Sequence, residues 1–149
     1  PVYADGMVYT AQPYGDLAAI RTGGTGDVTE THVAWTRYDG TPDITSPLCD
    51  GKLIWTLTTD GWLICRDATT GEEKYNHEFN REFKASPCLA GGRLLLWDTA
   101  GLCVMLAPGE TFNVQGTAPL GERVEASPAF VAGRIYIRGD ENLYCIERP

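Results

Sequence analysis

The amino-acid sequence predicts an all-β fold built from a repeated unit, and three observations support this prediction. The 149 residues include 17 Gly and 9 Pro, which favour short strands joined by tight turns. Four Trp and seven Tyr, with no long segment rich in Ala, Leu, Glu and Lys, favour strands over helices. The same order of turns and apolar runs also returns after about forty residues, which indicates a structural repeat.

Each unit opens on a proline and continues through a turn that contains Gly. The opening residues are Pro1, Pro47, Pro87 and Pro128, and the last three follow a Ser. A proline is tolerated in a first strand because the missing N–H costs little there. The turns are expected at residues 5–6, 50–51, 91–92 and 132–133. Gly supplies the positive φ that a two-residue hairpin needs.

Two apolar strands follow each turn. We expect second strands at residues 7–9, 53–55, 94–97 and 135–137, and third strands at residues 15–19, 61–65, 101–105 and 141–145. The last position of the third strand is a compact apolar residue in each unit, namely Ala19, Cys65, Met105 and Cys145. Such a position would let neighbouring sheets approach closely, so two of the Cys are predicted to be packing residues.

The fourth strand varies most between the units. We expect it at residues 33–36, 74–79 and 111–114, and the last unit has none. Polar residues and changes of length cost least on the outer edge of a radial sheet, which is where this strand would lie. Residues 22–30 and 116–123 are predicted to be loops. The stretch 46–79 is the best preserved unit, a four-stranded antiparallel meander.

A repeated four-stranded unit of this length is typical of a β-propeller. We expect a partial propeller with blades at about residues 1–45, 46–85, 86–126 and 127–149, or about three and a half to four blades. A ring usually has roughly four to eight blades. We therefore expect the remaining blades of a larger protein, or a second copy of the chain, to close the ring.

The segment from Asp67 to Tyr75, together with the Ser-Pro openings and the Gly-x-Leu-x-Cys third strands, resembles the tryptophan-docking repeat of pyrroloquinoline-quinone-like (PQQ-like) propellers. In that family an Asp-x-x-Thr-Gly turn leads into the outer strand, and an aromatic residue, usually Trp, docks on the next blade. Asp67, Thr70 and Gly71 match the turn, and Tyr75 stands at the Trp position. The resemblance implies that these four residues form a structural docking motif.

The resemblance covers essentially the whole chain, although the docking motif is complete in one blade only. Trp35 keeps the aromatic residue of the first blade without the Thr-Gly turn, and residues 107–112 are a shortened version in the third. Residues 143–149 resemble the C-terminus of this family. The chain is therefore interpreted as the C-terminal part of a larger propeller.

The resemblance implies two classes of function. Some members are bacterial scaffold proteins that bind other proteins, including outer-membrane assembly scaffolds. Others are quinoprotein dehydrogenases, which hold the quinone with Ca²⁺ in the central channel and use an Asp as base beside a vicinal disulfide. The family also implies a periplasmic or secreted location, while the free Cys leave the cytoplasm open.

The residues themselves favour the scaffold. The sequence has no adjacent Cys pair, and Asp5, Asp50 and Asp60 lie in turns, where Asp is most often a turn residue. We expect a non-catalytic module that binds a protein partner, with no catalytic, cofactor-binding or metal-binding residue in this chain. The alternative is the C-terminal part of a quinoprotein alcohol or sugar dehydrogenase whose catalytic residues lie outside this chain.

Charge and hydropathy argue against nucleic acid as a partner and against a membrane-spanning segment. The net charge of -8 and the pI near 4.6 argue against nucleic acid, whose phosphates require clustered Lys and Arg. No apolar run reaches the roughly 18 to 20 residues that a membrane-spanning helix needs. The sequence does not open on a charged and then apolar leader. This means little, because the chain begins at Pro1 without an initiator Met and is interpreted as an internal piece.

Several other residues are candidates for sites, and each has a structural interpretation that we prefer. The Cys, at positions 49, 65, 88, 103 and 145, are predicted to be small core residues. His32 and His77 are expected in or beside fourth strands, not at a metal. The run Gly23 to Gly26 lacks the strand-to-helix context of a phosphate loop. Four aromatic residues could form a patch that binds sugars or peptides, but we expect them to pack between blades. They are Trp55, Trp62, Trp97 and Tyr136.

Overall fold

The computed structural model describes residues 1–147, which form four antiparallel sheets. Arg148 and Pro149, which the sequence assigns to the fourth blade and the C-terminus, lie outside the described residues. The first sheet contains β1 (Val2–Ala4), β2 (Met7–Ala11), β3 (Leu17–Arg21) and β4 (Val33–Arg37). The second contains β5 (Leu48–Cys49), β6 (Leu53–Leu57), β7 (Trp62–Asp67) and β8 (Glu73–Glu78).

The other two sheets complete the repeat. The third contains β9 (Cys88–Ala90), β10 (Arg93–Trp97), β11 (Leu102–Leu106) and β12 (Val114–Pro119). The fourth contains β13 (Ala129–Val131), β14 (Arg134–Arg138) and β15 (Leu143–Glu147). A one-turn helix, α1 (Thr29–His32), precedes β4. No helix among residues 1–147 is long and apolar enough to cross a membrane.

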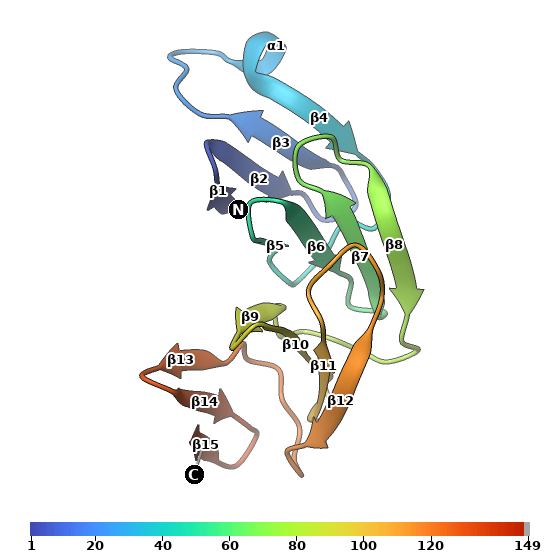
Figure 1. The fold of residues 1–149 in the computed structure, drawn as a ribbon, viewed down its shortest axis with the longest axis vertical. Helices are drawn as coiled ribbons and strands as arrows, with labels where there is room; N and C mark the ends of the chain where they lie inside the picture. The colour runs from blue at the N-terminus through green and yellow to red at the C-terminus, as the bar shows by residue number, and fades with distance from the viewer. Residues whose placement is uncertain (148–149) are drawn as a thin grey trace.

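The sheets follow one another along an arc, from the N-terminal sheet at one end to the C-terminal sheet at the other (Figure 1). Within each sheet the strands lie in sequence order, and β4, β8 and β12 lie on the convex side of the arc. This is the radial arrangement of propeller blades. The predicted all-β fold and partial propeller are therefore confirmed.

The registers show that the repeat is structural. Tyr9 pairs with Ala19, which pairs with Trp35 in the first sheet. Three residues at the same positions of the second sheet, Trp55, Cys65 and Tyr75, pair in the same way. In the third sheet the corresponding residues are Leu95, Met105 and Gly116. Gly116 thus occupies the outer-strand position that an aromatic residue holds in the first two sheets.

The outer strand of the third sheet differs from its prediction. The sequence predicted a strand at residues 111–114 and a loop at 116–123, but β12 runs from Val114 to Pro119. A register shift after Met105, with the Ala107 N–H bonded to the Asn113 carbonyl at 3.0 Å, lengthens the connection. Backbone pairing with β11, and not apolar side chains, holds this mostly exposed edge strand, so its sequence carries little strand pattern.

Apolar side chains fill the seams between neighbouring sheets. The first seam is packed by Tyr9, Leu17, Ala19, Trp35, Ile54 and Ala68. The second is packed by Leu53, Trp55, Leu57, Leu63, Cys65, Phe83, Leu94, Leu96, Val104 and Leu106. The third is packed by Ala85, Leu95, Trp97, Cys103, Val124 and Ile137. Each fully buried large side chain contributes about 1.5 to 3 kcal/mol to folding.

The compact apolar position of the third strand is buried only where a sheet covers it. Ala19 and Cys65 are fully buried, Met105 is half-buried and Cys145 is exposed. The prediction that Cys145 is a packing residue is therefore wrong for the described chain. Cys145 pairs with Tyr136 on the outward face of the last sheet, where no further sheet lies within residues 1–147.

Trp35 joins the first two sheets. Its indole N–H donates to the Ala68 carbonyl at 2.9 Å, and the Tyr9 hydroxyl donates to the same oxygen at 3.2 Å. The Trp35 ring lies against Gly71, whose backbone has φ +70°; a Cβ there would lie 2.7 Å from the ring. Arg37 donates to the Gly71 carbonyl at 3.0 Å. Gly71 is thus required both by its backbone conformation and by the close approach of Trp35.

We predict that Gly71→Ala destabilises the protein more than Gly92→Ala does. Gly92 has φ +71° but no atom near the position of an added Cβ, so it is a matched control for backbone strain alone. Overpacking against Trp35 should add about 2 kcal/mol to the loss at Gly71. Urea unfolding followed by tryptophan fluorescence measures both free energies. Equal losses of unfolding free energy in the two variants would show that the Trp35 ring does not restrict the side chain at position 71.

Candidate functional site

The turn predicted as a docking motif is organised by the Asp67 carboxylate. Its Oδ1 accepts hydrogen bonds from the backbone N–H of Thr70 at 2.8 Å and of Thr69 at 2.9 Å, and from the Thr70 hydroxyl at 3.1 Å. These hydrogen bonds, above all the one from the Thr70 N–H, favour the charged carboxylate and lower the pKa of Asp67 below its usual value. Asp67 is therefore an ionised residue whose hydrogen bonds shape the turn.

Tyr75 lies in β8 and faces the second seam, whereas Gly71 faces the first. The Tyr75 hydroxyl accepts a hydrogen bond from the Trp55 indole at 3.0 Å, and its ring meets Phe112 edge-on at 5.9 Å. Burial raises the pKa of Tyr75, so its hydroxyl stays protonated. The four predicted docking residues are therefore divided between two seams, with Trp35 as the aromatic residue that contacts Gly71.

The Cys are free thiols with different degrees of burial. Cys65 and Cys103 are buried, and burial raises the pKa of each to about 12. Cys49 and Cys88 are half-buried, and burial raises the pKa of Cys88 to about 11. These raised pKa values keep the thiols uncharged at neutral pH, which makes them poor nucleophiles.

The two His are far apart in the fold and lie in different environments. His32 ends α1, and its Nδ1 lies 2.7 Å from the Thr31 hydroxyl. His77 lies in β8, where its ring stacks on Phe112 at 3.9 Å and meets Phe79 edge-on at 4.7 Å. Among residues 1–147 there is no group of three or more His, Cys, Asp or Glu side chains that could hold a metal ion.

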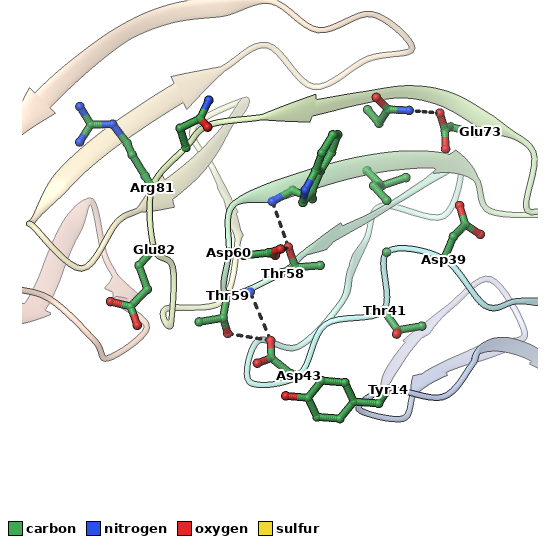
Figure 2. A pocket seen from close by; sticks show the side chains of 15 residues that line it. Tyr14, Asp39, Thr41, Asp43, Thr58, Thr59, Asp60, Glu73, Arg81 and Glu82 are labelled. Carbon is green, nitrogen blue, oxygen red and sulfur yellow. Dashed lines mark hydrogen bonds between the residues drawn. The ribbon is translucent and has the colours of Figure 1, made fainter.

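A recess of about 990 Å³ opens at one end of the first seam. Residues from four connections line it, namely those between β2 and β3, β4 and β5, β6 and β7, and β8 and β9. Further lining residues come from β7 and β8. Figure 2 shows Tyr14, Asp43 and Thr59 on one side of this space and Arg81 and Glu82 on another. We call it the loop-face recess.

The lining of the loop-face recess is acidic. It contains one cationic residue, Arg81, and the carboxylates Asp39, Asp43, Asp60, Glu73 and Glu82. Arg66 holds two of these carboxylates, at 2.5 Å from Asp39 and 3.7 Å from Glu73. The Arg66 side chain is only 4% exposed, so this ion pair ties the β4–β5 connection to the second sheet.

Trp62 is the aromatic residue whose position differs most from its prediction. Trp55 and Trp97 are buried and Tyr136 is half-buried, but Trp62 is 36% exposed and lines the loop-face recess. The prediction that Trp62 packs between blades is therefore wrong. Trp62 is the first residue of β7. At this end of the strand its side chain faces the recess and is not covered by the first sheet.

Sequence reasoning did not find this recess because its residues come from separate turns. Asp43 binds Thr59 of the next sheet, with 2.6 Å between its Oδ1 and the Thr59 hydroxyl. Asp60 accepts a hydrogen bond from the Thr58 hydroxyl of its own turn. Each carboxylate thus has a local structural role, and in the sequence each resembles an ordinary turn residue. No spacing in the chain links residues 14, 43, 60 and 81.

No protein-family model matches the sequence, and no curated protein matches it significantly. Solved structures do resemble the fold. BamB from Moraxella catarrhalis superimposes with a TM-score of 0.73 at 18% identity, over 95% of this chain and 43% of BamB. Quinohemoprotein alcohol dehydrogenase from Comamonas testosteroni superimposes with a TM-score of 0.67 at 16% identity, over 92% of this chain and 28% of the enzyme.

A third similar structure is the β-propeller domain of Cps50 (Swd1) from Myceliophteria thermophila, with a TM-score of 0.70 at 16% identity. The superposition covers 96% of this chain and 52% of the Cps50 chain. The chain thus spans about half or less of each of these three proteins. At such identities the likeness establishes the fold alone. The chain is a partial β-propeller whose structural neighbours include BamB and quinoprotein dehydrogenases, the group that the sequence resemblance indicated.

Proposed function

We propose that the chain is a non-catalytic part of a β-propeller and binds another polypeptide through the face that carries the loop-face recess. The observation that supports this most directly is the recess itself, an open space of about 990 Å³ lined by residues of several connections. Connections held by a rigid scaffold are the usual place for binding residues. The face is therefore suited to a partner that contacts several turns at once.

The hydrogen bonding of the carboxylates supports a structural role for them. Asp50 accepts from the N–H groups of Lys52 at 2.9 Å and Leu53 at 2.8 Å. Asp98 is buried, accepts from the Leu102 N–H at 2.8 Å and is paired with Arg81. Oxygens occupied in this way stabilise turns, as is common for Asp in hairpins.

We also propose that other blades, or a second copy of this chain, complete the ring. Within residues 1–147, β15 has no strand on its outer side, and the last sheet exposes Val131 and Leu143. Unpaired strand edges and exposed apolar faces favour association with another sheet. A bacterial periplasmic or secreted location follows from the family resemblance only.

The proposal predicts that a partner polypeptide contacts one face of the blades and not the other. The β2–β3 turn at residues 12–16 carries Tyr14, which is 95% exposed at the recess. Replacing this turn in the full-length protein by a Gly-Ser turn of equal length should abolish recovery of the partner in a pull-down. The control is the same replacement at residues 22–30, which join β3 to β4 at the opposite end of the strands. Loss of the partner only in the control variant would contradict the proposed face.

The second candidate function is that of a quinoprotein dehydrogenase, favoured by the structural likeness to quinohemoprotein alcohol dehydrogenase. The two functions differ in how the full-length protein responds to pyrroloquinoline quinone with Ca²⁺. A ligand at 100 times its Kd stabilises the folded state by about 2.7 kcal/mol. We expect no change in the melting temperature, measured by differential scanning calorimetry. A rise at saturating quinone that disappears without Ca²⁺ would support the dehydrogenase instead.

A further inference from the structure

The positive charge near the loop-face recess is largely neutralised by particular carboxylates. The Arg81 guanidinium lies 2.6 Å from Asp98, a buried carboxylate of the third sheet. Arg66 is paired with Asp39 and Glu73, as described above. Asp43 and Asp60 have no Lys, Arg or His nitrogen within 4.0 Å among residues 1–147. The recess therefore carries negative charge that is not compensated by the chain itself.

Trp62 provides an observation independent of this charge. The other three Trp are at most 7% exposed, whereas Trp62 leaves 36% of its surface uncovered beside the carboxylates. Burying apolar surface contributes roughly 25 cal/mol per Å², and the exposed part of the Trp62 ring lacks this contribution. A ligand that covers the ring would recover it. An indole face also attracts cations within about 6 Å.

The β6–β7 turn fixes the position of Trp62 relative to Asp60. The Thr58 hydroxyl donates to Asp60 and accepts from the Trp62 backbone N–H at 2.9 Å. Figure 2 shows Thr58 and Asp60 close together in this turn. The backbone of Trp62 and the Asp60 carboxylate are thus held by the same hydroxyl before any ligand arrives. Such preorganisation reduces the entropy lost on binding.

The size of the recess favours an extended organic cation over a metal ion. A metal such as Ca²⁺ needs six to eight oxygen ligands within about 2.6 Å, and the described residues form no such group. The space of about 990 Å³ is large enough for a long side chain. Lysine and arginine combine an apolar stem, which can cover Trp62, with a charged end that can reach the carboxylates.

We infer that the loop-face recess binds a lysine or arginine side chain of the partner polypeptide, with its stem against Trp62 and its charge near Asp43 and Asp60. This inference rests on the proposed function and adds the chemistry of the partner. Asp39 and Glu73, held by Arg66, contribute further negative charge at the recess. The partner segment is therefore basic, complementary to the charge of -8 on this chain.

The inference is tested with a synthetic peptide of alternating Lys and Gly, and with the same peptide carrying Gln in place of Lys. Isothermal titration calorimetry on the full-length protein measures both affinities. We expect the Lys peptide to bind at least about tenfold more tightly than the Gln peptide, and its affinity to fall as salt is added. Trp62→Leu should weaken binding of the Lys peptide by about tenfold, because it removes the flat aromatic surface against which the stem of the Lys side chain lies.

Asp60→Asn is the second variant, since an amide oxygen can keep the bond from Thr58 while the charge is lost. It should weaken binding by about fivefold. The matched control is Asp140→Asn, which makes the same change of net charge at an exposed turn between β14 and β15. Equal effects of Asp60→Asn and Asp140→Asn, or equal affinities for the two peptides, would overturn the inference.

The outcomes also separate this inference from the proposed function. A partner that is lost when residues 12–16 are replaced, but still binds the Trp62→Leu and Asp60→Asn variants, overturns the cationic recognition and leaves the scaffold standing. Binding of the Lys peptide with the expected dependence on Trp62, without any partner lost on replacement of residues 12–16, supports the recess chemistry and overturns the scaffold. Free spermidine distinguishes the source of the cation: spermidine that binds as tightly as the peptide overturns the assignment to a polypeptide.

Discussion

The packing of each sheet against its two neighbours is the constraint on which the rest of the structure depends. Side chains alternate along a strand, so Ile54 faces the first sheet while Trp55 faces the third sheet across the next seam. A sheet in the middle of the arc is therefore buried on both faces. Small residues at the closest points, such as Ala19 and Gly71, allow the large ring of Trp35 to fill the first seam.

Hydrogen bonds repeated from one sheet to the next hold the connections in place around this packing. The N–H of Ser46 donates to the hydroxyl of Ser86, and the N–H of Ser86 donates to the hydroxyl of Ser127, each at 2.9 Å. In each connection between sheets an acidic side chain also accepts a hydrogen bond from the turn between the second and third strands of the following sheet, in the pairs Asp43 and Thr59, Glu82 and Thr99, and Glu122 and Glu141. The connections are thus fixed over the next turn, and at the first seam they surround the loop-face recess.

Residues that line the loop-face recess also stabilise the seam beneath it. Asp43 is bonded to Thr59, and Asp39 to Arg66, so these carboxylates stabilise the seam while remaining at the edge of an open space. Groups held in this way lose little freedom when a ligand arrives. The second seam lacks an equivalent exposed ring: Leu102, the first residue of β11 as Trp62 is of β7, packs against the core of that seam.

The sequence by itself determined the elements that depend on local physics. Gly61 and Gly101, both with positive φ, mark turns between the second and third strands, and short apolar runs mark the strands on either side. Only the tertiary structure decided which side chains are covered. Trp55 and Trp62 both belong to apolar strands, yet the first is fully buried and the second lines the loop-face recess. Burial depends on a neighbouring sheet far away in sequence. The contact between Trp35 and Gly71 therefore could not be predicted from spacing in the sequence. The same holds for the grouping of carboxylates around the recess.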